Sequence, residues 1–372
     1  METQDASSAL VLGNDYSDPS VVATVPVGRH PYGAVYDAAR GEVFVTNADS
    51  GSVSVINDTT DAVVAVVPVG VGPVGAAYDA VDGEIFVTGY SSSDVSVISD
   101  RNDTVIATIP VGTGPSGVAY DAAKSEVFVA NFYPNNVSVI NCTNDTVVAS
   151  IPVGTFPIGV AYDEARGAVF VTNSGSNNLS VISDSIDSVV ATVPVGSNPE
   201  GVADDGASGE VFVTNSDSNT VSVVSGTTDK VVATVPVGSH PYGAAYDAAN
   251  GEVFVADLGS NTVTVISGAT DTVVATIPVG TNPWGATYDG AKGEVFVTNQ
   301  QSDSVSVISD AFSPTAFLGL PGDEGFYVLW GIITAVGVAI AGVLLARRRK
   351  DKTSERPAIP GPKGPPPPSG PS

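Results

Sequence analysis

The chain has 372 residues, of which 40 are acidic and 14 are basic. Residues 1–325 carry 38 acidic and seven basic side chains, a net charge of −31, whereas residues 326–372 carry a net charge of +5. Because the negative field of the main body repels phosphate backbones, we expect no binding of nucleic acid. A single cysteine, Cys142, and two histidines exclude an intrachain disulfide and a multi-histidine metal or haem site.

The first 20 residues form a polar N-terminal extension. Met1–Asp5 contains no basic residue, and no apolar stretch typical of a secretory signal follows it. Two alternatives stay open at this point. Either the natural chain starts further upstream, or a C-terminal anchor inserts the protein and leaves its main body inside the cell.

A repeat of 42 residues follows the extension. The tripeptide Pro-Val-Gly recurs seven times at a constant interval of 42 residues, and no insertion interrupts the series. A repeat of about 40–45 residues is typical of the blades of a β-propeller. The tripeptides begin at Pro26, Pro68, Pro110, Pro152, Pro194, Pro236 and Pro278.

Each repeat contains four short runs of β-branched residues separated by turn residues, as at Gly33–Tyr36, Glu42–Thr46, Val53–Ile56 and Val63–Val69. The first run is rich in glycine and alanine, the second is dense in valine and phenylalanine, and the fourth contains a proline. Small residues in the first run fit where strands converge on a narrow axis, and bulky residues in the second fit a strand packed on both faces. A proline in the fourth run fits a strand at the sheet edge. We therefore predict an all-β fold, a seven-bladed β-propeller with four-stranded blades over residues 21–310, and not a stacked solenoid.

The two ends of the repeat region complement each other. The region starts with a strand of the fourth type, residues 21–27, and its last repeat stops after a strand of the third type, Val305–Ile308. A missing fourth strand would leave an unpaired sheet edge in the last blade. We therefore predict that residues 21–27 complete the seventh blade and close the ring.

The repeat carries a recognisable signature. Phe-Val-Thr-Asn occurs at Phe44–Asn47, Phe170–Asn173, Phe212–Asn215 and Phe296–Asn299, and Val-Ser-Val-Ile precedes Val-Val-Ala-Thr-Ile/Val-Pro-Val-Gly. In these motifs residues 21–308 resemble the YVTN family of β-propeller repeats. The resemblance implies a seven-bladed propeller in a cell-surface or surface-layer-like protein, as in archaea and other prokaryotes. It implies no reaction, because one fold hosts many functions.

A membrane anchor is predicted after a linker at residues 311–325. Residues 326–346 carry no charge, and as a helix they would span about 31 Å, enough to cross a bilayer core. Aromatic residues stand at one end and Arg347–Lys350 at the other, which predicts a single-pass membrane helix with the propeller outside the cell. Six Asn-x-Ser/Thr sequences, the acceptor sites of N-glycosylation, agree with a propeller outside the cell. Residues 347–372, first basic and then proline-rich, are expected to be a disordered cytoplasmic tail.

The repeats differ from one another mainly beside the turn proline and in the turn between the second and third strands. In an up-and-down blade these turns lie on the same face of the propeller, and the chain leaves by the other face towards the membrane. Exposed aromatic residues gathered on one face are typical of a binding surface. We predict ligand binding, without catalytic residues or metal ligands, at His30, Tyr32, Tyr90, Phe132, Tyr133, Phe156, Glu200, His240, Tyr242 and Trp284.

Two sets of residues allow a second interpretation. His30 and His240 occupy one repeat position, as duplicated turn residues or as a pair of ligands. An aspartate ends the first strand of every repeat and is expected to cap the following turn. Seven carboxylates near one end of the channel also offer oxygen ligands to Ca²⁺, the one cofactor left open. These aspartates are Asp37, Asp79, Asp121, Asp163, Asp205, Asp247 and Asp289.

Two functions follow from these patterns. The first is a non-enzymatic binding, adhesion or structural module, held in the cell membrane, whose distal face engages a surface glycan, another surface protein or a neighbouring cell. The alternative is a metal-dependent, lactonase-like ecto-hydrolase with its site at the propeller channel. Its candidate acids and base are Glu200, Asp204 and Asp205, in the most divergent repeat.

Overall fold

The computed structural model describes residues 19–310. Most of the predicted N-terminal extension, the linker at residues 311–325, the membrane segment at residues 326–346 and the tail at residues 347–372 lie outside the described residues. Residues 19–310 contain no helix that is long and apolar enough to cross a bilayer.

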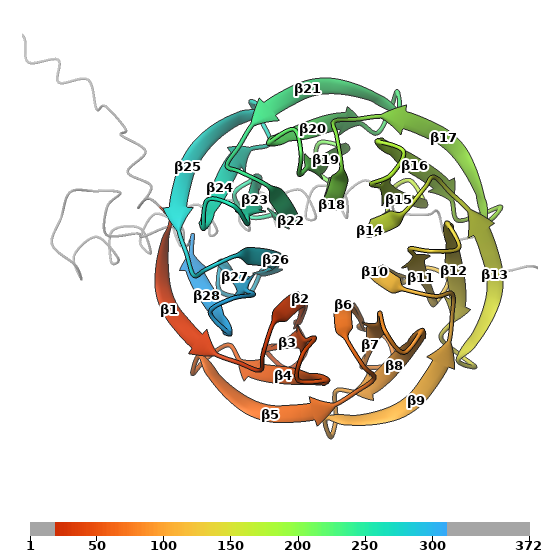
Figure 1. Cartoon of the computed structure of the whole chain (residues 1–372), viewed down its shortest axis with the longest axis vertical. Coiled ribbons are helices and arrows are strands. Elements are labelled where there is room, and N and C mark those ends of the chain that lie inside the picture. The colour runs from red at the N-terminus through yellow and green to blue at the C-terminus, as the bar shows by residue number, and fades with distance from the viewer. Residues whose placement is uncertain (1–18, 311–372) are drawn as a thin grey trace, which may run out of the picture. The chain divides into compact units, whose positions relative to one another are not determined.

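The described residues form seven four-stranded antiparallel sheets arranged as blades around a channel (Figure 1). From the channel outwards, the first blade consists of β2 (Pro31–Asp37), β3 (Glu42–Asn47), β4 (Ser52–Asn57) and β5 (Ala62–Pro68). The predicted all-β fold, a seven-bladed propeller with four-stranded blades, is thus confirmed.

The next five blades repeat this order from inner to outer strand. Blade two is β6 (Pro73–Asp79), β7 (Glu84–Gly89), β8 (Asp94–Ser99) and β9 (Thr104–Pro110), and blade three is β10 (Pro115–Asp121), β11 (Glu126–Asn131), β12 (Asn136–Asn141) and β13 (Thr146–Pro152). Blade four is β14 (Pro157–Asp163), β15 (Ala168–Asn173), β16 (Asn178–Ser183) and β17 (Ser188–Pro194). Blade five is β18 (Pro199–Asp205), β19 (Glu210–Asn215), β20 (Thr220–Ser225) and β21 (Lys230–Pro236), and blade six is β22 (Pro241–Asp247), β23 (Glu252–Asp257), β24 (Thr262–Ser267) and β25 (Thr272–Pro278).

The seventh blade joins the two ends of the described chain. Its inner strands are β26 (Pro283–Asp289), β27 (Glu294–Asn299) and β28 (Ser304–Ser309), and its outer strand is β1 (Ser20–Pro26). β1 pairs antiparallel with β28, with Val25 opposite Val305. The side chain of Val25 is only 2% exposed, so β1 contributes to the core as well as to the sheet.

The core lies between the blades. The second strand of each blade contains Val-Phe-Val, or Ile-Phe-Val in blade two, and both faces of this strand are buried. Phe44 packs against Ile85 and Val87 of the next blade, and Phe296 packs against Val43 of the first blade, which closes the ring. Burial of one such phenylalanine stabilises the fold by about 1.5–3 kcal/mol. The seven equivalent side chains are Phe44, Phe86, Phe128, Phe170, Phe212, Phe254 and Phe296.

The inner strands touch one another through glycine. A Cβ atom on Gly33 would lie 2.3 Å from the carbonyl oxygen of Val74 in the next blade, a distance that no side chain tolerates. The hydroxyl of Thr46 donates a hydrogen bond of 2.8 Å to the same carbonyl oxygen. The seven glycines of this ring are Gly33, Gly75, Gly117, Gly159, Gly201, Gly243 and Gly285.

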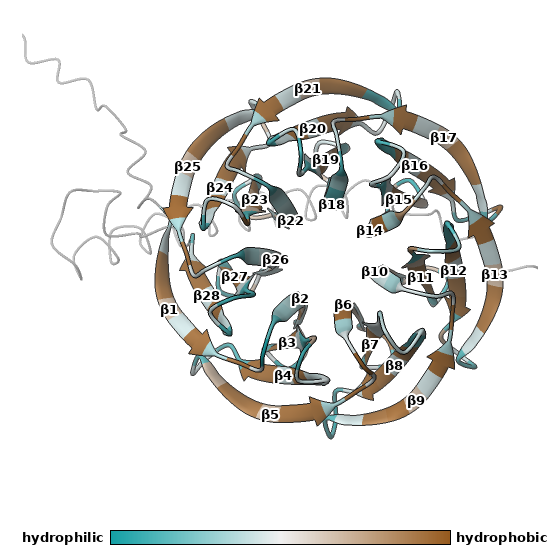
Figure 2. Ribbon diagram, viewed as in Figure 1, coloured by the Kyte–Doolittle hydropathy of each residue, from teal (hydrophilic) through white to brown (hydrophobic). Residues whose placement is uncertain are grey.

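The fourth strands form the outer edge of the propeller and are largely hydrophobic (Figure 2). Each contains a proline, which lacks the N–H that a strand paired on both sides would need and so suits a sheet edge. The outward side chain of Val22 in β1 is 55% exposed, whereas Val25 in the same strand is buried. Together with the glycine ring, this gives the radial gradient that the sequence predicts.

Candidate functional site

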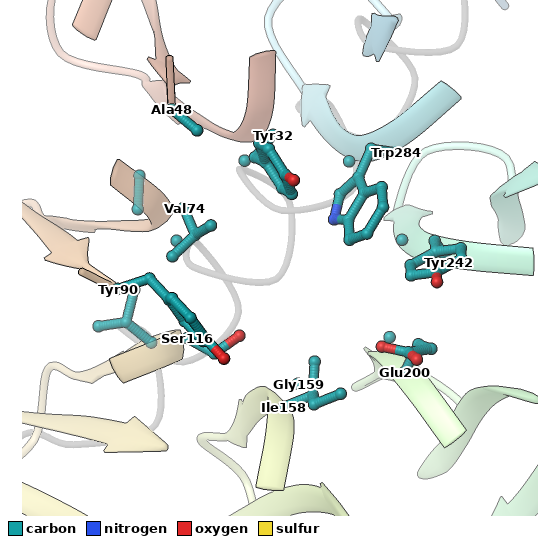
Figure 3. A pocket seen from close by; sticks show the side chains of 18 of the residues that line it. Tyr32, Ala48, Val74, Tyr90, Ser116, Ile158, Gly159, Glu200, Tyr242 and Trp284 are labelled. Carbon is teal, nitrogen blue, oxygen red and sulfur yellow. The ribbon is translucent and has the colours of Figure 1, made fainter. Parts of the chain in front are cut away.

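A cavity of about 780 Å³ lies at the end of the channel where the inner strands begin (Figure 3). Its floor is made by the glycine ring and by the small residues that follow those glycines. Its walls include the residue that follows the turn proline in every blade. These seven wall residues are Tyr32, Val74, Ser116, Ile158, Glu200, Tyr242 and Trp284.

A β-bulge brings these side chains to the cavity. In β2 the pairing with β3 shifts between Pro31 and Ala34, so that Tyr32 and Gly33 face one residue of the partner strand. The N–H of Gly33 leaves the ladder and donates instead to the hydroxyl of Thr46, at 2.8 Å. Because bulges redirect side chains at the ends of strands, this local feature sets the cavity position in each blade.

The turn before each inner strand adopts a strained conformation. The residue that precedes the turn proline has a positive φ in all seven blades, which glycine, asparagine and histidine tolerate better than bulky residues. His30 has a φ of 50°, and its N–H donates to Asp303 Oδ1 of the seventh blade. Phe156 holds a φ of 54°, an uncommon conformation for a large aromatic residue, and the turn imposes it because the equivalent residue of every blade shares it.

Three rings from adjacent blades form an aromatic wall, defined here as Tyr32, Tyr242 and Trp284. The ring centroids of Tyr32 and Trp284 are 4.7 Å apart, and those of Tyr242 and Trp284 are 4.0 Å apart. All three are partly buried, and burial raises the pKa of Tyr242 to about 12. The wall is therefore a continuous aromatic surface, whose tyrosines stay neutral at physiological pH.

A second group, the aromatic rim, consists of Tyr90, Phe132, Tyr133 and Phe156. Phe132 stacks on Phe156 with a centroid distance of 4.6 Å and an interplanar angle of 9°, and its edge meets Tyr133 at 5.2 Å. Tyr90 and Phe132 line the cavity, whereas Tyr133 and Phe156 are 58% and 39% exposed. The rim thus extends from the cavity to the surface, and Tyr90 stands across the cavity from the wall (Figure 3).

Glu200 is the acidic residue that faces the cavity beside the wall. It lies at the start of β18 next to Tyr242 (Figure 3), and only 6% of its surface is exposed. Burial raises the pKa of its carboxyl group to about 8, the charge of Asp217 adds to the effect, and a hydrogen bond with Asn198 opposes it. The carboxyl group is therefore mostly protonated at neutral pH.

The two histidines do not line the cavity. His30 Nδ1 lies 2.9 Å from Asp49 Oδ2, and the backbone N–H of His240 donates to Asn219 Oδ1. Both residues occupy the positive-φ position of their turns. The structure thus places them as repeated turn residues of blades one and six and does not bring them together.

The acidic residues proposed for the alternative hydrolase function, Glu200, Asp204 and Asp205, lie at different ends of β18. Glu200 and Asp204 stand near opposite ends of β18, about 13 Å apart along an extended strand. Asp204 lines a separate small cavity with Tyr162 and Asp163, and burial raises its pKa to about 7. Glu200, Asp204 and Asp205 therefore do not converge on one site.

The aspartates that end the inner strands cap turns. Asp37 Oδ1 accepts hydrogen bonds from the N–H groups of Ala39 and Arg40, at 2.8 and 3.2 Å. Equivalent bonds are present in the other blades. Within residues 19–310, no group of three or more His, Cys, Asp or Glu side chains is placed to hold a metal ion.

The candidate residues identified in the sequence omit part of the cavity. Val74, Ser116 and Ile158 occupy the same repeat position as Tyr32 but are neither aromatic nor charged. Val71 lies in the turn before Pro73, one residue further from the turn proline than the positions that the sequence singled out. The repeat position, and not the residue type, was the signal that could have identified the first three.

Fold and site together define the class: a seven-bladed β-propeller with a partly aromatic cavity at one mouth of its channel. No family model matches the sequence, and no curated protein matches it. Among solved structures, the chain is similar to the hydrazine synthase of Kuenenia stuttgartiensis, with a TM-score of 0.70 and 20% sequence identity over 76% of this chain and 96% of that chain. A likeness at this level of identity shows the propeller fold alone.

Proposed function

We propose that the protein is a YVTN-type propeller of a prokaryotic, archaeal-type cell surface, anchored in the membrane by residues 326–346, that captures a surface partner without catalysis. The roles of the signature residues support the family assignment. Phe44 fills a blade interface, Thr46 bonds to the next blade, and Asn47 donates to Ser54 Oγ at 3.0 Å. Each is a structural role that recurs in most of the blades, so the signature leaves the cavity residues free to specialise.

The aromatic cavity is the observation that carries the proposed binding function. The aromatic wall and Tyr90 present ring surfaces on two sides of one concave site. Concave sites lined by aromatic and apolar groups with a few polar groups are the usual form of a ligand pocket. Aromatic side chains also dominate the energetics of protein recognition. A surface glycan, a surface protein or a neighbouring cell would present the group that enters.

The direction of the chain supports a cavity that faces away from the cell. The last described residue, Asp310, lies at the other end of the strands from the cavity, where Asn250 Nδ2 donates to its carboxylate at 2.9 Å. The uncharged segment at residues 326–346 and the basic residues that follow it suit a membrane helix whose positive end stays in the cytoplasm.

A capture assay on intact cells tests this function. Cells that display the full chain are mixed with labelled cells of the same strain and with labelled polymers of its envelope, and the bound label is measured. We expect the combined Tyr32→Ala, Tyr242→Ala and Trp284→Ala changes to reduce capture at least about tenfold, since hot-spot aromatics contribute 2 kcal/mol or more each. Tyr120→Phe, near the other end of an inner strand, is the control and should retain capture. Undiminished capture by a folded triple variant would remove the cavity from the function.

A further inference from the structure

The cavity combines aromatic faces with an unusual distribution of charge. Among its lining residues, all of which the structure describes, there is no lysine, arginine or histidine, and the only acids are Asp49 and Glu200. Residues 19–310 carry 32 acidic and seven basic side chains, a net charge of −25. Asp49 is engaged at the edge by His30, which leaves Glu200 as the carboxyl group facing the wall. The lining therefore offers a cation one carboxyl group and several aromatic faces, and it offers an anion no group of opposite charge.

The polar groups of the cavity are few and simple. Besides the two acids, its side chains offer the hydroxyls of Tyr32, Tyr90, Tyr242, Ser91 and Ser116 and the indole N–H of Trp284. None of these described lining residues offers an amide or guanidinium side chain to hold adjacent hydroxyls of a sugar in a bidentate manner. An anionic ligand would also find no cationic side chain in this lining. The remaining surface, including Val71, Val74 and Ile158, is apolar.

From these observations we infer that the group that enters the cavity is an organic cation of the quaternary or methylated ammonium class, bound against the aromatic wall beside Glu200. This inference rests on the proposed function and specifies the chemistry of its ligand. A methylated ammonium presents an apolar surface that carries a diffuse positive charge. The face of an aromatic ring attracts that charge, most strongly when the ring is tryptophan. The methyl groups would contact the valine and isoleucine side chains.

Glu200 makes the binding of a cation depend on pH. The titratable groups that face it are Asp217 and Tyr242, and Asn198 is hydrogen bonded to it. A cation in contact with the carboxyl group favours its ionised form and lowers its pKa, so binding releases a proton below pH 8. Affinity should therefore rise between pH 6 and pH 9. A neutral ligand would not show this rise.

Calorimetric titration of the full chain in a maltoside detergent tests the inference. The probes are choline and 3,3-dimethyl-1-butanol, which has nearly the same shape but carries no charge. We expect choline to bind at least about tenfold more tightly than the alcohol, in line with a desolvated cation–π contact. Trp284→Leu should weaken choline binding about tenfold, Trp284→Phe should weaken it less, and Tyr120→Phe should leave it unchanged. Glu200→Gln should abolish the increase in affinity with pH and the release of a proton.

Other outcomes overturn the inference in distinguishable ways. Equal affinity for the alcohol would mean an apolar pocket without selection for charge. Absence of choline binding at millimolar concentration would also overturn it, as would a pH dependence that survives Glu200→Gln. If cell capture still depends on Tyr32, Tyr242 and Trp284 in any of these cases, the cavity binds a ligand of another class and the proposed function stands. If capture does not depend on them, the proposed function fails as well.

Discussion

At the scale of single residues, departures from the repeat carry most of the information. The last residue of the second strand is asparagine in five blades, and its buried amide donates to the third strand, as Asn47 does to Ser54. In blade six this position is Asp257, which accepts a hydrogen bond of 2.6 Å from the hydroxyl of Thr264. Burial raises the pKa of Asp257 to about 6 in spite of that bond. An ionised carboxylate is therefore destabilising at this position.

Asp257→Asn should stabilise the propeller at neutral pH. The pKa of Asp257 is higher in the folded chain than its ordinary value of 3.8, so its stabilising contribution is complete below pH 4 and is lost as the pH rises through 6. We expect the variant to gain about 2 kcal/mol in free energy of unfolding at pH 8 and little at pH 4. Urea unfolding at both pH values measures the difference.

Asp82→Asn is the matched control for this prediction, because Asp82 is exposed. Its stability should follow that of the unchanged protein at both pH values. An Asp257→Asn variant with the same gain at pH 4 and pH 8 would show that the ionisation of Asp257 does not limit stability.

At the scale of the strands, β1 closes the ring, because it joins the N-terminal end of the described chain to the last blade. It lies at the sheet edge, and without it β28 would expose a row of unpaired backbone groups. Val25 faces the core of the seventh blade, whereas Val22 in the same strand faces solvent. The two valines therefore allow a comparison within one element.

Val25→Asp should open the ring, and Val22→Asp should not. A carboxylate at position 25 would be buried without a partner, which costs several kcal/mol. We expect the melting temperature to fall by about 10 °C or more for Val25→Asp, and to change by only a degree or two for Val22→Asp. Thermal unfolding followed by circular dichroism measures both. Equal melting temperatures for the two variants would mean that β1 does not hold the ring closed.

The strands were predictable from the sequence to within a few residues, because the period of 42 aligns seven copies of each turn. β3 was expected at Glu42–Thr46 and spans Glu42–Asn47. The β-bulge at Tyr32 and Gly33 was not predicted, because the sequence does not reveal that the hydroxyl of Thr46 accepts a hydrogen bond from the N–H of Gly33. The repeat pattern therefore predicts which strand of the blade a residue belongs to. It does not predict where the side chain points after a β-bulge.

The same limit applies to the site. Differences between repeats indicated one face and most of its aromatic residues, because equivalent turns of a ring share a face. These differences could not show that Tyr32 lines the cavity whereas His30, two residues earlier, does not. The side chain of His30 pairs with Asp49 instead. The burial of Glu200 also depends on side chains from neighbouring blades, which no local pattern contains.

At the scale of the whole molecule, three basic residues link neighbouring blades at the face opposite the cavity. The ammonium groups of Lys124 and Lys292 donate to the backbone oxygens of Asp184 and Asp58 in the next blade, and Arg166 donates to Asp229 at 3.1 Å. These cations link neighbouring blades near the turns that end the inner strands.

Protease treatment of intact cells tests the proposed orientation. With the propeller outside and residues 347–372 inside, we expect proteinase K to cleave or release the propeller while a cytoplasmic control protein survives. Immunoblots against the propeller and the control follow both. Protection of the propeller until the cells are lysed would place it inside the cell and would direct the search for partners there.

The most direct test of the binding site is a crystal structure of the full chain grown with arsenocholine, in which arsenic replaces the quaternary nitrogen. We expect an anomalous peak inside the cavity, over the faces of Trp284 and Tyr242 and next to Glu200, and no such peak in crystals of the Tyr32→Ala, Tyr242→Ala and Trp284→Ala variant. A peak only on the acidic surface outside the cavity, or equal peaks in both crystals, would contradict recognition of a cation by the aromatic wall.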